Sequence, residues 1–320
     1  MILKPIKDID LFTQKSENII GVFGSKKWLS VYGDNLNLVG IYKDEQQLIG
    51  GFFYIIVKKN GFDFVKLPPY TPHCGLFFVS ESKNQSSINN FCKDVMNEVC
   101  NYFINQKSSL TVLAFPLSIK DFQPFIWNKF KVIPNYTYRI NLGNSLDEIK
   151  NNFDSKNRNL INKAIKDSVL VTENLMTYNE LFHFFSNSLN NSGANVYLNE
   201  LKNIFLNFSC SENSFSFTAK KDSEILGNVF CIYDKHVCYY LLGGTNKKSG
   251  FQGVNNLLVQ KCIEKAKELG CNTFDFEGSM IKGVEKFFRG FGGELVPYYT
   301  VNKASFWLEM LLKFKKREIF

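Results

Sequence analysis

The same order of strands and helices is predicted twice along this chain of 320 residues. Residues 40–57 and residues 218–234 each read as two apolar strands joined by a turn that contains Lys-Asp. Each hairpin is followed by a further strand, a long amphipathic helix, a short strand, a phenylalanine-rich short helix and a closing strand. Coincidence among common α/β elements is the alternative, but an order of seven elements that occurs twice indicates an internal duplication.

The two copies of this order predict two domains of a mixed α/β class. Their expected boundaries are residues 1–136 and residues 137–303, and a basic amphipathic helix is expected over residues 304–320. In each domain an antiparallel hairpin is followed by a strand, a helix and a strand, which is typical of a mixed sheet covered by helices. The second domain also begins with a long helix, which starts near Ser145 and carries residues 151–168.

Composition and charge exclude several classes of protein. No run of about 18 apolar residues occurs, so no membrane span is predicted, and the first ten residues lack the apolar segment of a signal peptide. The eight cysteines show no CxxC spacing, which favours a reduced protein in the cytoplasm. The net charge of +8 indicates a modest preference for anionic partners. Only four arginines occur, without a basic and aromatic nucleic-acid motif, so specific DNA binding is not expected.

The most informative segment is residues 274–293, where a strand that carries two acids runs into a basic short helix. Asp275 and Glu277 are expected on one face of this strand, because side chains alternate along a strand. Glu277 is nearer the strand end, where ligands collect in sheets with parallel strands, and a carboxylate there can serve as general base toward an amine. Ion pairs with nearby lysines or with Arg289 are the structural alternative.

A glycine-rich loop, residues 243–253, joins a predicted strand to the long helix of the second domain. Glycine allows the backbone to approach a ligand closely, and a helix N-terminus presents free N–H groups to an anion. The loop therefore either cradles the pyrophosphate of an acyl carrier such as coenzyme A or is a surface loop with solvated lysines. The candidate cofactor-binding residues are Gly243, Gly244, Lys247, Lys248, Gly250 and Gly253.

Two further segments offer candidate substrate-binding residues. Arg158 lies on the helix that leads the second domain; an arginine suits bidentate binding of a phosphate or carboxylate, and a solvated helix face is the alternative. Tyr70 and His73 belong to a proline-stiffened loop, residues 67–75, which is either a ligand wall or only a rigid connection. His73 has no second histidine or cysteine at metal-binding spacing, so no metal site is predicted.

These segments together resemble a known family. The hairpin, the glycine-rich loop, the long helix, the stretch FDFEG at residues 274–278 and FGGE at residues 291–294 look like the GNAT acyltransferase fold. The duplicated form, with Lys156 and Arg158 on the leading helix, is similar to the Fem-type peptidoglycan aminoacyltransferases and to acetyltransferase-like proteins of polysaccharide gene clusters. The loop keeps only the first glycine of the GNAT coenzyme A motif, and FFR at residues 287–289 stands where Fem-type enzymes tend to have Phe-Lys.

The resemblance implies transfer of an acyl or aminoacyl group to an amine of a cell-envelope polysaccharide or peptidoglycan precursor, by direct attack without a covalent enzyme intermediate. Glu277, or else Asp275, would accept the amine proton, and Arg158 and Arg289 would hold phosphates of donor or acceptor. The donor would be acyl-CoA or aminoacyl-tRNA, and the acceptor a nucleotide-linked or lipid-linked amino sugar or peptide. A catalytically inactive GNAT-like binding module is the alternative that involves no turnover.

The C-terminal helix adds a possible membrane contact. Its apolar residues, among them Trp307 and Leu311, are interleaved with Lys313 and further basic residues. Such a helix can rest on an anionic membrane, which would place a cytoplasmic enzyme at the inner membrane face. The alternative is that the helix packs onto the second domain.

Overall fold

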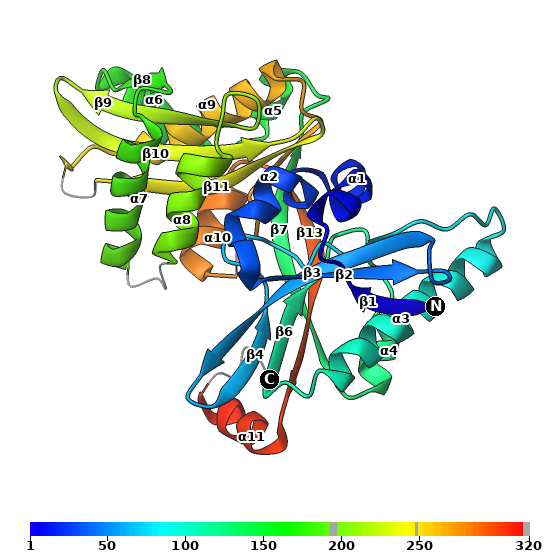
Figure 1. Ribbon diagram of the computed structural model, residues 1–320. Coiled ribbons are helices and arrows are strands. Elements are labelled where there is room, and N and C mark those ends of the chain that lie inside the picture. The colour runs from blue at the N-terminus through cyan, green and yellow to red at the C-terminus, as the bar shows by residue number, and fades with distance from the viewer. Residues whose placement is uncertain (193–196, 247–248, 279, 316–320) are drawn as a thin grey trace. The chain divides into compact units, whose positions relative to one another are not determined.

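The computed structural model describes residues 1–192, 197–246, 249–278 and 280–315 (Figure 1). Tertiary contacts divide the chain into two compact units. Unit 1 consists of Met1–Asn135 and Pro297–Phe320, and unit 2 of Tyr136–Val296. Each unit contains a mixed sheet with helices, as the sequence predicts.

The sheet of unit 1 has the strand order β1-β2-β3-β4-β6-β13. Neighbouring strands pair antiparallel except β4 and β6, which run parallel, and the short β5 pairs with β3. The strands are β1 (Ile2–Pro5), β2 (Leu36–Tyr42), β3 (Leu48–Lys59), β4 (Phe62–Lys66), β5 (Phe77–Phe78), β6 (Leu110–Ala114) and β13 (Glu294–Ala304).

The core of unit 1 is formed by apolar strand residues and the buried face of its longest helix. This helix, α3, begins where the Asn84 side chain accepts a hydrogen bond from the Ser87 N–H, a regular N-cap. Its residues Val95, Val99 and Phe103 are buried in the core. The helices of unit 1 are α1 (Ile9–Ile20), α2 (Lys26–Leu29), α3 (Gln85–Asn105), α4 (Gln123–Trp127) and α11 (Phe306–Lys315), with 3₁₀ turns at Gly21–Gly24 and Ser30–Asn35.

The sheet of unit 2 has the strand order β7-β12-β11-β10-β9-β8. Strands β11 and β12 run parallel and the other neighbours pair antiparallel. The strands are β7 (Lys131–Asn141), β8 (Leu170–Glu173), β9 (Ser214–Lys221), β10 (Glu224–Tyr233), β11 (Val237–Thr245) and β12 (Thr273–Asp275).

The central helix of unit 2 is α9, which packs against β9, β10 and β11 and against α6. Its residues Leu258, Cys262 and Ala266 are spaced by four and are fully buried in the core, as the amphipathic pattern predicts. The helices of unit 2 are α5 (Leu146–Asn151), α6 (Ser155–Lys166), α7 (Tyr178–Ser192), α8 (Leu198–Asn203), α9 (Val254–Glu268) and α10 (Lys282–Arg289), with a π-helical turn at Ile204–Phe208.

The duplicated order of elements is confirmed. The hairpin β2–β3, strand β4, helix α3, strand β6 and helix α4 recur as β9–β10, β11, α9, β12 and α10. In each copy the strand after the hairpin pairs in parallel with the short strand that follows the long helix. This repeated crossover gives both units the same topology.

The closing strands are exchanged between the two copies. β7 follows α4 of the first copy, yet its residues Arg139–Asn141 pair with β12 of unit 2. β13 follows α10 of the second copy, yet its residues 300–304 pair with β6 of unit 1. Residues 297–303 therefore pack with unit 1, whereas the boundary expected from the sequence assigns them to the second domain.

The long helix expected at the start of the second domain is two helices. The N-cap predicted at Ser145 is confirmed, because its hydroxyl accepts from the Glu148 N–H while the Glu148 carboxylate accepts from the Ser145 N–H. The helix ends at Asn151, however, and a second one starts after Asp154, whose carboxylate accepts from the Asn157 N–H at 2.6 Å. The N-cap at Asp154 thus starts a new helix inside a stretch that the apolar periodicity alone predicts as one continuous helix.

None of the helices within the described ranges is long and apolar enough to cross a lipid bilayer.

Candidate active site

The candidate site lies where the parallel strands β11 and β12 of unit 2 stop pairing. Their last paired residues are Tyr239 and Asp275. β11 continues to Thr245, whereas β12 ends at Asp275. Beyond this point the sheet opens between the two strands, at the carboxyl end where ligands collect in sheets with parallel strands.

Strand β11 also contains a bulge just beyond this point. Tyr240 faces Cys231 of β10, but Leu242 faces the adjacent Phe230, so Leu241 is an extra residue without a cross-strand partner on β10. A bulge bends its strand and disrupts the ladder locally. It therefore adds to the separation of β11 from β12.

Asp275 is buried, and its carboxylate is held by three neighbours. Oδ1 accepts hydrogen bonds from the Thr137 hydroxyl at 2.6 Å and from the backbone N–H of Glu277 at 2.8 Å. Oδ2 lies 3.1 Å from Nε of Arg139. Burial raises the pKa of Asp275, and these three partners act in the opposite direction. Asp275 therefore fixes the backbone that carries Glu277.

Glu277 follows β12 in a left-handed backbone conformation, with φ of 59°, which is uncommon for a residue with a side chain. The strand ends at Asp275, so the expected placement of both acids on one strand face is wrong. The Glu277 carboxyl oxygen Oε1 is buried and has no hydrogen-bond partner in the described part of the chain. Burial, and then the Asp275 carboxylate, raise the pKa of Glu277 well above the ordinary carboxyl value. A raised pKa makes the carboxylate form of Glu277 a stronger base than an ordinary glutamate, and it favours the protonated form in the resting protein.

The three neighbouring strands β7, β12 and β11 place a row of polar residues at this end of the sheet. Arg139 on β7 pairs with Asp275 on β12, which pairs with Tyr239 on β11. Burial and then the surrounding carboxylates raise the pKa of Tyr239 well above the ordinary phenol value, so its hydroxyl stays neutral. Sequence reasoning missed Arg139, Thr137 and Tyr239, because the register that aligns them is a property of the folded sheet.

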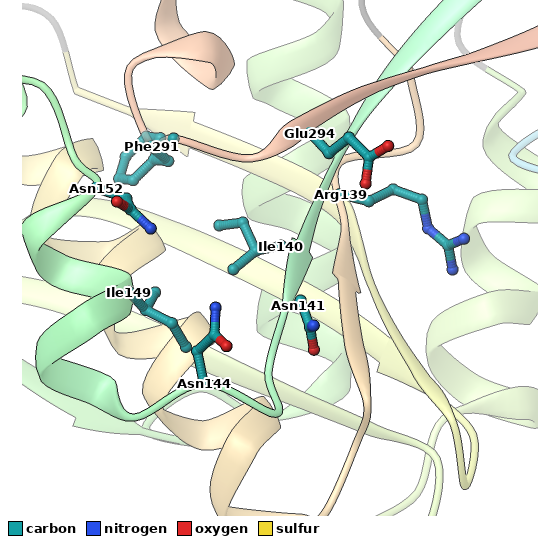
Figure 2. A pocket seen from close by; sticks show the side chains of 9 residues that line it. Arg139, Ile140, Asn141, Asn144, Ile149, Asn152, Phe291 and Glu294 are labelled. Carbon is teal, nitrogen blue, oxygen red and sulfur yellow. The ribbon is translucent and has the colours of Figure 1, made fainter.

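A polar pocket of about 170 Å³ within unit 2 is lined in part by Arg139 (Figure 2). Figure 2 shows amide side chains around it and the Glu294 carboxylate on the side of Arg139. Hydrogen-bonding side chains of this kind suit a polar, uncharged ligand group. The lining residues are Arg139, Ile140, Asn141, Asn144, Ile149, Asn152, Phe291, Gly292 and Glu294.

The first two glycines of the loop serve packing within unit 2. A Cβ on Gly243 would lie 1.7 Å from the Tyr240 hydroxyl oxygen, and a Cβ on Gly244 would lie 2.7 Å from Oγ of Ser188. Both positions are therefore closed by neighbouring side chains. Lys247 and Lys248, the expected cationic residues of the loop, lie outside the described residues.

The last two glycines form the turn into α9. Gly250 and Gly253 have φ of 75° and 77°, which glycine adopts without strain. Gly250 faces open space, whereas a Cβ on Gly253 would lie 2.0 Å from the Leu160 carbonyl oxygen of α6. Gly253 is the N-cap residue of α9 and has no side chain that could cap the helix. Its main role in the described structure is therefore the close packing of α9 against α6.

Asn157, which lies between Lys156 and Arg158, anchors helix α6 to helix α9. Asn157 is buried, and its Oδ1 accepts a hydrogen bond of 2.9 Å from Nδ2 of Asn256 on α9. Arg158 is exposed, and its Nη1 donates to the backbone carbonyls of Asn151 and Phe153. The Arg158 guanidinium thus caps the C-terminus of α5.

Arg289, the other expected arginine, lies at the end of α10 and is also exposed. Its Nε lies 3.4 Å from Oε1 of Glu285, which also accepts a 2.8 Å hydrogen bond from the Tyr138 hydroxyl. The Arg289 side chain is 61% exposed, so this pair leaves much of the guanidinium open to a ligand. The helix itself is held by Phe288, which stacks on Phe276 with ring centroids 4.5 Å apart.

Tyr70 and His73 lie in a well-packed loop of unit 1. Tyr70 has a left-handed backbone with φ of 59°. The Nδ1 atom of His73 accepts from the Gly75 N–H at 3.1 Å, and its ring packs edge-on against Phe23. Burial lowers the pKa of His73 to about 4, so the imidazole is neutral at physiological pH.

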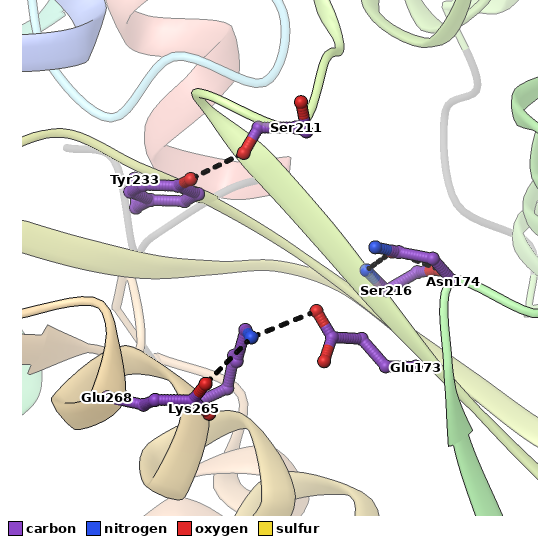
Figure 3. A network of polar contacts seen from close by, with 7 residues as sticks. All are labelled: Glu173, Asn174, Ser211, Ser216, Tyr233, Lys265 and Glu268. Atoms are coloured by element: carbon purple, nitrogen blue, oxygen red, sulfur yellow. Dashed lines mark hydrogen bonds and ion pairs between the residues drawn. The ribbon is translucent and has the colours of Figure 1, made fainter.

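A separate polar network in unit 2 supports the fold (Figure 3). Nζ of Lys265 on α9 lies 3.2 Å from Glu173 on β8 and 3.3 Å from Glu268. Asn174 accepts a hydrogen bond from the Ser216 N–H at 2.9 Å, as Figure 3 shows. These contacts tie the edge strand β8 to the central helix and to β9.

In the part of the chain that the structure describes, no group of three or more histidine, cysteine, aspartate or glutamate side chains is placed to hold a metal ion.

Comparison with known proteins supports the GNAT resemblance. Residues 203–289, which run from α8 to α10, match the family model described as acetyltransferase (GNAT) domain. No curated protein sequence matches the chain. The matched segment contains the hairpin, the opening between β11 and β12, the loop and Glu277.

Solved structures match almost the whole chain. FemX superposes with a TM-score of 0.65 at 13% identity, covering 98% of this chain and 99% of FemX. A tandem GNAT protein from the clavulanic acid biosynthesis pathway gives 0.52 at 6% identity, covering 94% and 98%. L-PGS from Bacillus licheniformis gives 0.53 at 12% identity, covering 90% of each chain. The chain has a tandem GNAT fold.

The two GNAT-like units differ at the opening between their parallel strands. In unit 1, β4 and β6 pair up to Lys66 and Val112, as β11 and β12 do up to Tyr239 and Asp275. The chain then returns, because the Cys74 N–H donates to the carbonyl of Ala114 and the Cys74 carbonyl accepts from the Phe53 N–H. The loop of Tyr70 and His73 thus fills the opening of GNAT-like unit 1 with backbone.

Proposed function

We propose that this protein is an N-acyltransferase in which Glu277 is the general base toward an amine. The observation that carries the proposal is the buried oxygen Oε1 of Glu277, which has no hydrogen-bond partner in the described part of the chain and follows the point where β11 and β12 separate. The acetyltransferase (GNAT) match over residues 203–289 and the tandem GNAT protein among the structural neighbours support acyl transfer as the reaction class. Glu277 rather than Asp275 takes this role, because the Asp275 carboxylate already has three partners.

The proposed step is a direct transfer. The amine nitrogen attacks the acyl carbonyl carbon, and its proton passes to the Glu277 carboxylate. The leaving sulfur or oxygen atom of the donor takes up a proton from solvent as its bond to the acyl carbon breaks. Backbone N–H groups of β11 at the bulge of Leu241 are suited to stabilise the negative charge on the carbonyl oxygen.

The residues present fit a phosphate-bearing donor in part. The uncapped N-terminus of α9 and the turn at Gly250 offer backbone N–H groups to a phosphate. Gly243, Gly244 and Gly253 are used in packing, so the loop departs from a continuous glycine cradle. Acyl-CoA is the proposed donor and aminoacyl-tRNA the alternative, since both carry phosphates as well as an activated acyl group.

The acceptor that we propose is an amino sugar or amino-acid group of a cell-envelope polysaccharide or peptidoglycan precursor, nucleotide-linked or lipid-linked. The resemblance to Fem-type enzymes over nearly the whole chain supports this class. Arg289, with its largely exposed guanidinium, is the residue proposed to bind an acceptor phosphate. The amide-lined pocket beside Arg139 suits a neutral sugar group.

The test compares Glu277→Gln with the wild type in acyl transfer to amine acceptors. We expect kcat/KM to fall by a factor of about 100 or more, the usual contribution of a general base. Glu264→Gln is the matched control, because Glu264 is a largely buried acid of unit 2 whose partners, Lys150 and Lys261, have no proposed role in the site. A Glu277→Gln protein that keeps full activity would contradict the assignment.

The donor is identified by running the same reaction with acyl-CoA and with charged tRNA. Turnover that ribonuclease abolishes would identify aminoacyl-tRNA, and turnover that resists ribonuclease and requires acyl-CoA would identify the thioester. Binding of a nucleotide sugar without turnover of either donor would favour the non-catalytic binding module instead.

A further inference from the structure

The C-terminal helix α11 exposes its apolar side chains. At about 100° per residue, positions 306, 307, 310, 311 and 314 fall within an arc of roughly 140° on one face of the helix. Trp307 is 81% exposed and Phe314 is 79% exposed. An exposed stripe of this composition is rare on a soluble surface unless it contacts a partner or a membrane. The members of the stripe are Phe306, Trp307, Met310, Leu311 and Phe314.

The opposite face of α11 is the one turned toward the protein. Leu308, Glu309 and Leu312 are half-buried. Glu309 pairs with Lys313 at 3.0 Å, so the acid on this helix is neutralised. The wider apolar face of α11 is therefore the exposed one, the reverse of an ordinary surface helix. Tertiary contacts group α11 with unit 1, so the alternative expected from the sequence, packing onto the second domain, is wrong.

The turn between β3 and β4 lies at the same end of unit 1. The Ser305 N–H, just before α11, donates to the Ser109 carbonyl, and the Ser109 N–H donates to the Asp63 carbonyl of β4, both at 2.9 Å. Figure 1 draws α11 beside this turn. Phe62 at the turn is also exposed, at 47%. The apolar surface thus extends from the helix toward the hairpin.

Basic side chains surround this apolar surface. Lys58 and Lys59 flank the β3–β4 turn, and Lys107 precedes β6 at the same end; all three are exposed. Lys313 lies at the edge of the apolar stripe on α11. The acids of these segments are Asp63 and Glu309, and Glu309 is already paired. The sequence continues after α11 with further lysines and an arginine.

We propose that this end of unit 1, formed by α11 and the β3–β4 turn, docks on the surface of an anionic lipid bilayer. The aromatic and aliphatic side chains of α11 would enter the boundary between head groups and acyl chains, where tryptophan and phenylalanine are stable. The surrounding lysines would face the anionic head groups. The docking does not depend on acyl transfer, so the failure of one proposal leaves the other standing.

The experiment measures partition of the full-length protein into sedimented vesicles of phosphatidylcholine with and without about 30% phosphatidylglycerol, a composition chosen to give roughly physiological anionic charge. We expect binding that requires phosphatidylglycerol and weakens at high salt, because surface charges are screened. Tryptophan emission should shift to the blue on binding, and brominated lipid should quench it. Trp28 is buried, so only the emission of Trp307 and Trp127 can be sensitive to contact with lipid. Trp127 serves as the control.

Two matched variants distinguish lipid binding by this surface from nonspecific adsorption of the protein to vesicles. Trp307→Ala should lower the partition coefficient by about tenfold or more and remove the emission shift. Trp127→Ala should leave both within about twofold, because Trp127 is also exposed, at 62%, but lies on α4 under Lys93. The double change Lys58→Glu with Lys59→Glu should lower binding at least as strongly, since each basic residue near the surface contributes about fivefold.

Three outcomes would overturn the proposal. One is no binding to phosphatidylglycerol vesicles. Another is equal binding by the wild type and Trp307→Ala. The third is a concentration-dependent dimer in vesicle-free solution that Trp307→Ala dissociates, which would assign this face to a second copy of the chain.

Discussion

The carboxylate of Asp275 accepts a 2.8 Å hydrogen bond from the backbone N–H of Glu277, two residues further along. This bond holds Glu277 in its left-handed conformation, with φ of 59°. Asp275, the second candidate base from the sequence, therefore orients Glu277, the first candidate. The cost of that conformation, about 1 to 2 kcal/mol, must be offset by the surrounding contacts.

The first prediction concerns the stability of Glu277→Gln. Burial raises the folded-state pKa of Glu277, so the folded protein favours the protonated carboxyl. The associated stability is fully present below the ordinary glutamate pKa and is lost as pH rises through the raised folded-state pKa, by at most about 1.4 kcal/mol per pH unit. Glu277→Gln does not titrate, so we expect it to be more stable than the wild type at neutral pH.

Urea unfolding of both proteins between about pH 4 and pH 8 tests this expectation. The difference in unfolding free energy should vanish near the acid end of this range and grow in favour of the variant at higher pH. A constant difference across this range would show that the Glu277 carboxyl is ionised and solvated in the folded protein.

The second prediction concerns Asp275. Asp275→Ala removes the partner of Arg139 and leaves the Thr137 hydroxyl and the Glu277 N–H without their acceptor. We expect a loss of about 3 kcal/mol in unfolding free energy, the low end for a broken buried pair, because Arg139 is partly exposed. Asp275→Asn keeps a carbonyl acceptor and should cost about half as much. Asp275→Ala should also lower kcat, since the backbone of Glu277 is no longer fixed, and Asp275→Asn should lower it less.

The third prediction uses two glycines with almost the same backbone. Gly250 and Gly253 have φ of 75° and 77°, but only at Gly253 would a Cβ meet a neighbour, the Leu160 carbonyl oxygen at 2.0 Å. Gly250→Ala should cost only the left-handed strain, about 1 kcal/mol. Gly253→Ala should cost several kcal/mol, because α6 must move away from α9. Equal melting temperatures for the two variants would contradict the close contact between Gly253 and α6.

The fourth prediction concerns His73. Burial lowers its folded-state pKa to about 4 from the ordinary value of 6.5, so protonation favours the unfolded chain. Stability from this group should be complete above about pH 6.5 and decline as pH falls toward the folded-state pKa, by up to about 3 kcal/mol. His73→Asn retains an acceptor for the Gly75 N–H and should lose less stability over this range. The difference between the two unfolding curves isolates His73 from the other titrating groups.

The fifth prediction separates two roles for Arg158. Its guanidinium donates to the carbonyls of Asn151 and Phe153, which end α5. If capping is its whole role, Arg158→Ala should lower the unfolding free energy by about 1 kcal/mol and leave KM for both substrates unchanged. A KM raised about tenfold in a variant of unchanged stability would instead support the phosphate-binding role expected from the sequence.

The periodic patterns of the sequence predicted most of the regular structure. The long helix α9 and the hairpin β9–β10 follow from apolar spacing and a Lys-Asp turn, which act locally. The break between α5 and α6 was missed because Asp154 caps a new helix inside a continuous helical pattern. The strand β8 was missed as well, since a four-residue strand at a sheet edge has a weak pattern.

The candidate site was predictable only in part. The strand-end position of Glu277 identified it from the sequence, but its left-handed backbone and unpaired oxygen depend on contacts with Asp275 and on burial. Thr137 and Arg139 lie far from Asp275 in the sequence and reach it only through the pairing of β7 with β12. Gly243 was assigned to ligand binding, whereas the structure shows it beneath the Tyr240 hydroxyl.

Because the closing strands are exchanged, neither half of the sequence contains all the strands of one sheet. Strand β6 pairs with residues 300–304 of β13, which are synthesised near the end of translation. The sheet of unit 1 therefore cannot be completed until nearly the whole chain has been made. A fragment that stops after residue 136 would expose the edge of β6, an open template for aggregation. Each copy of the repeated order therefore depends on the other for the strand that completes its sheet, so that the repeat is a duplication in sequence but not in folding.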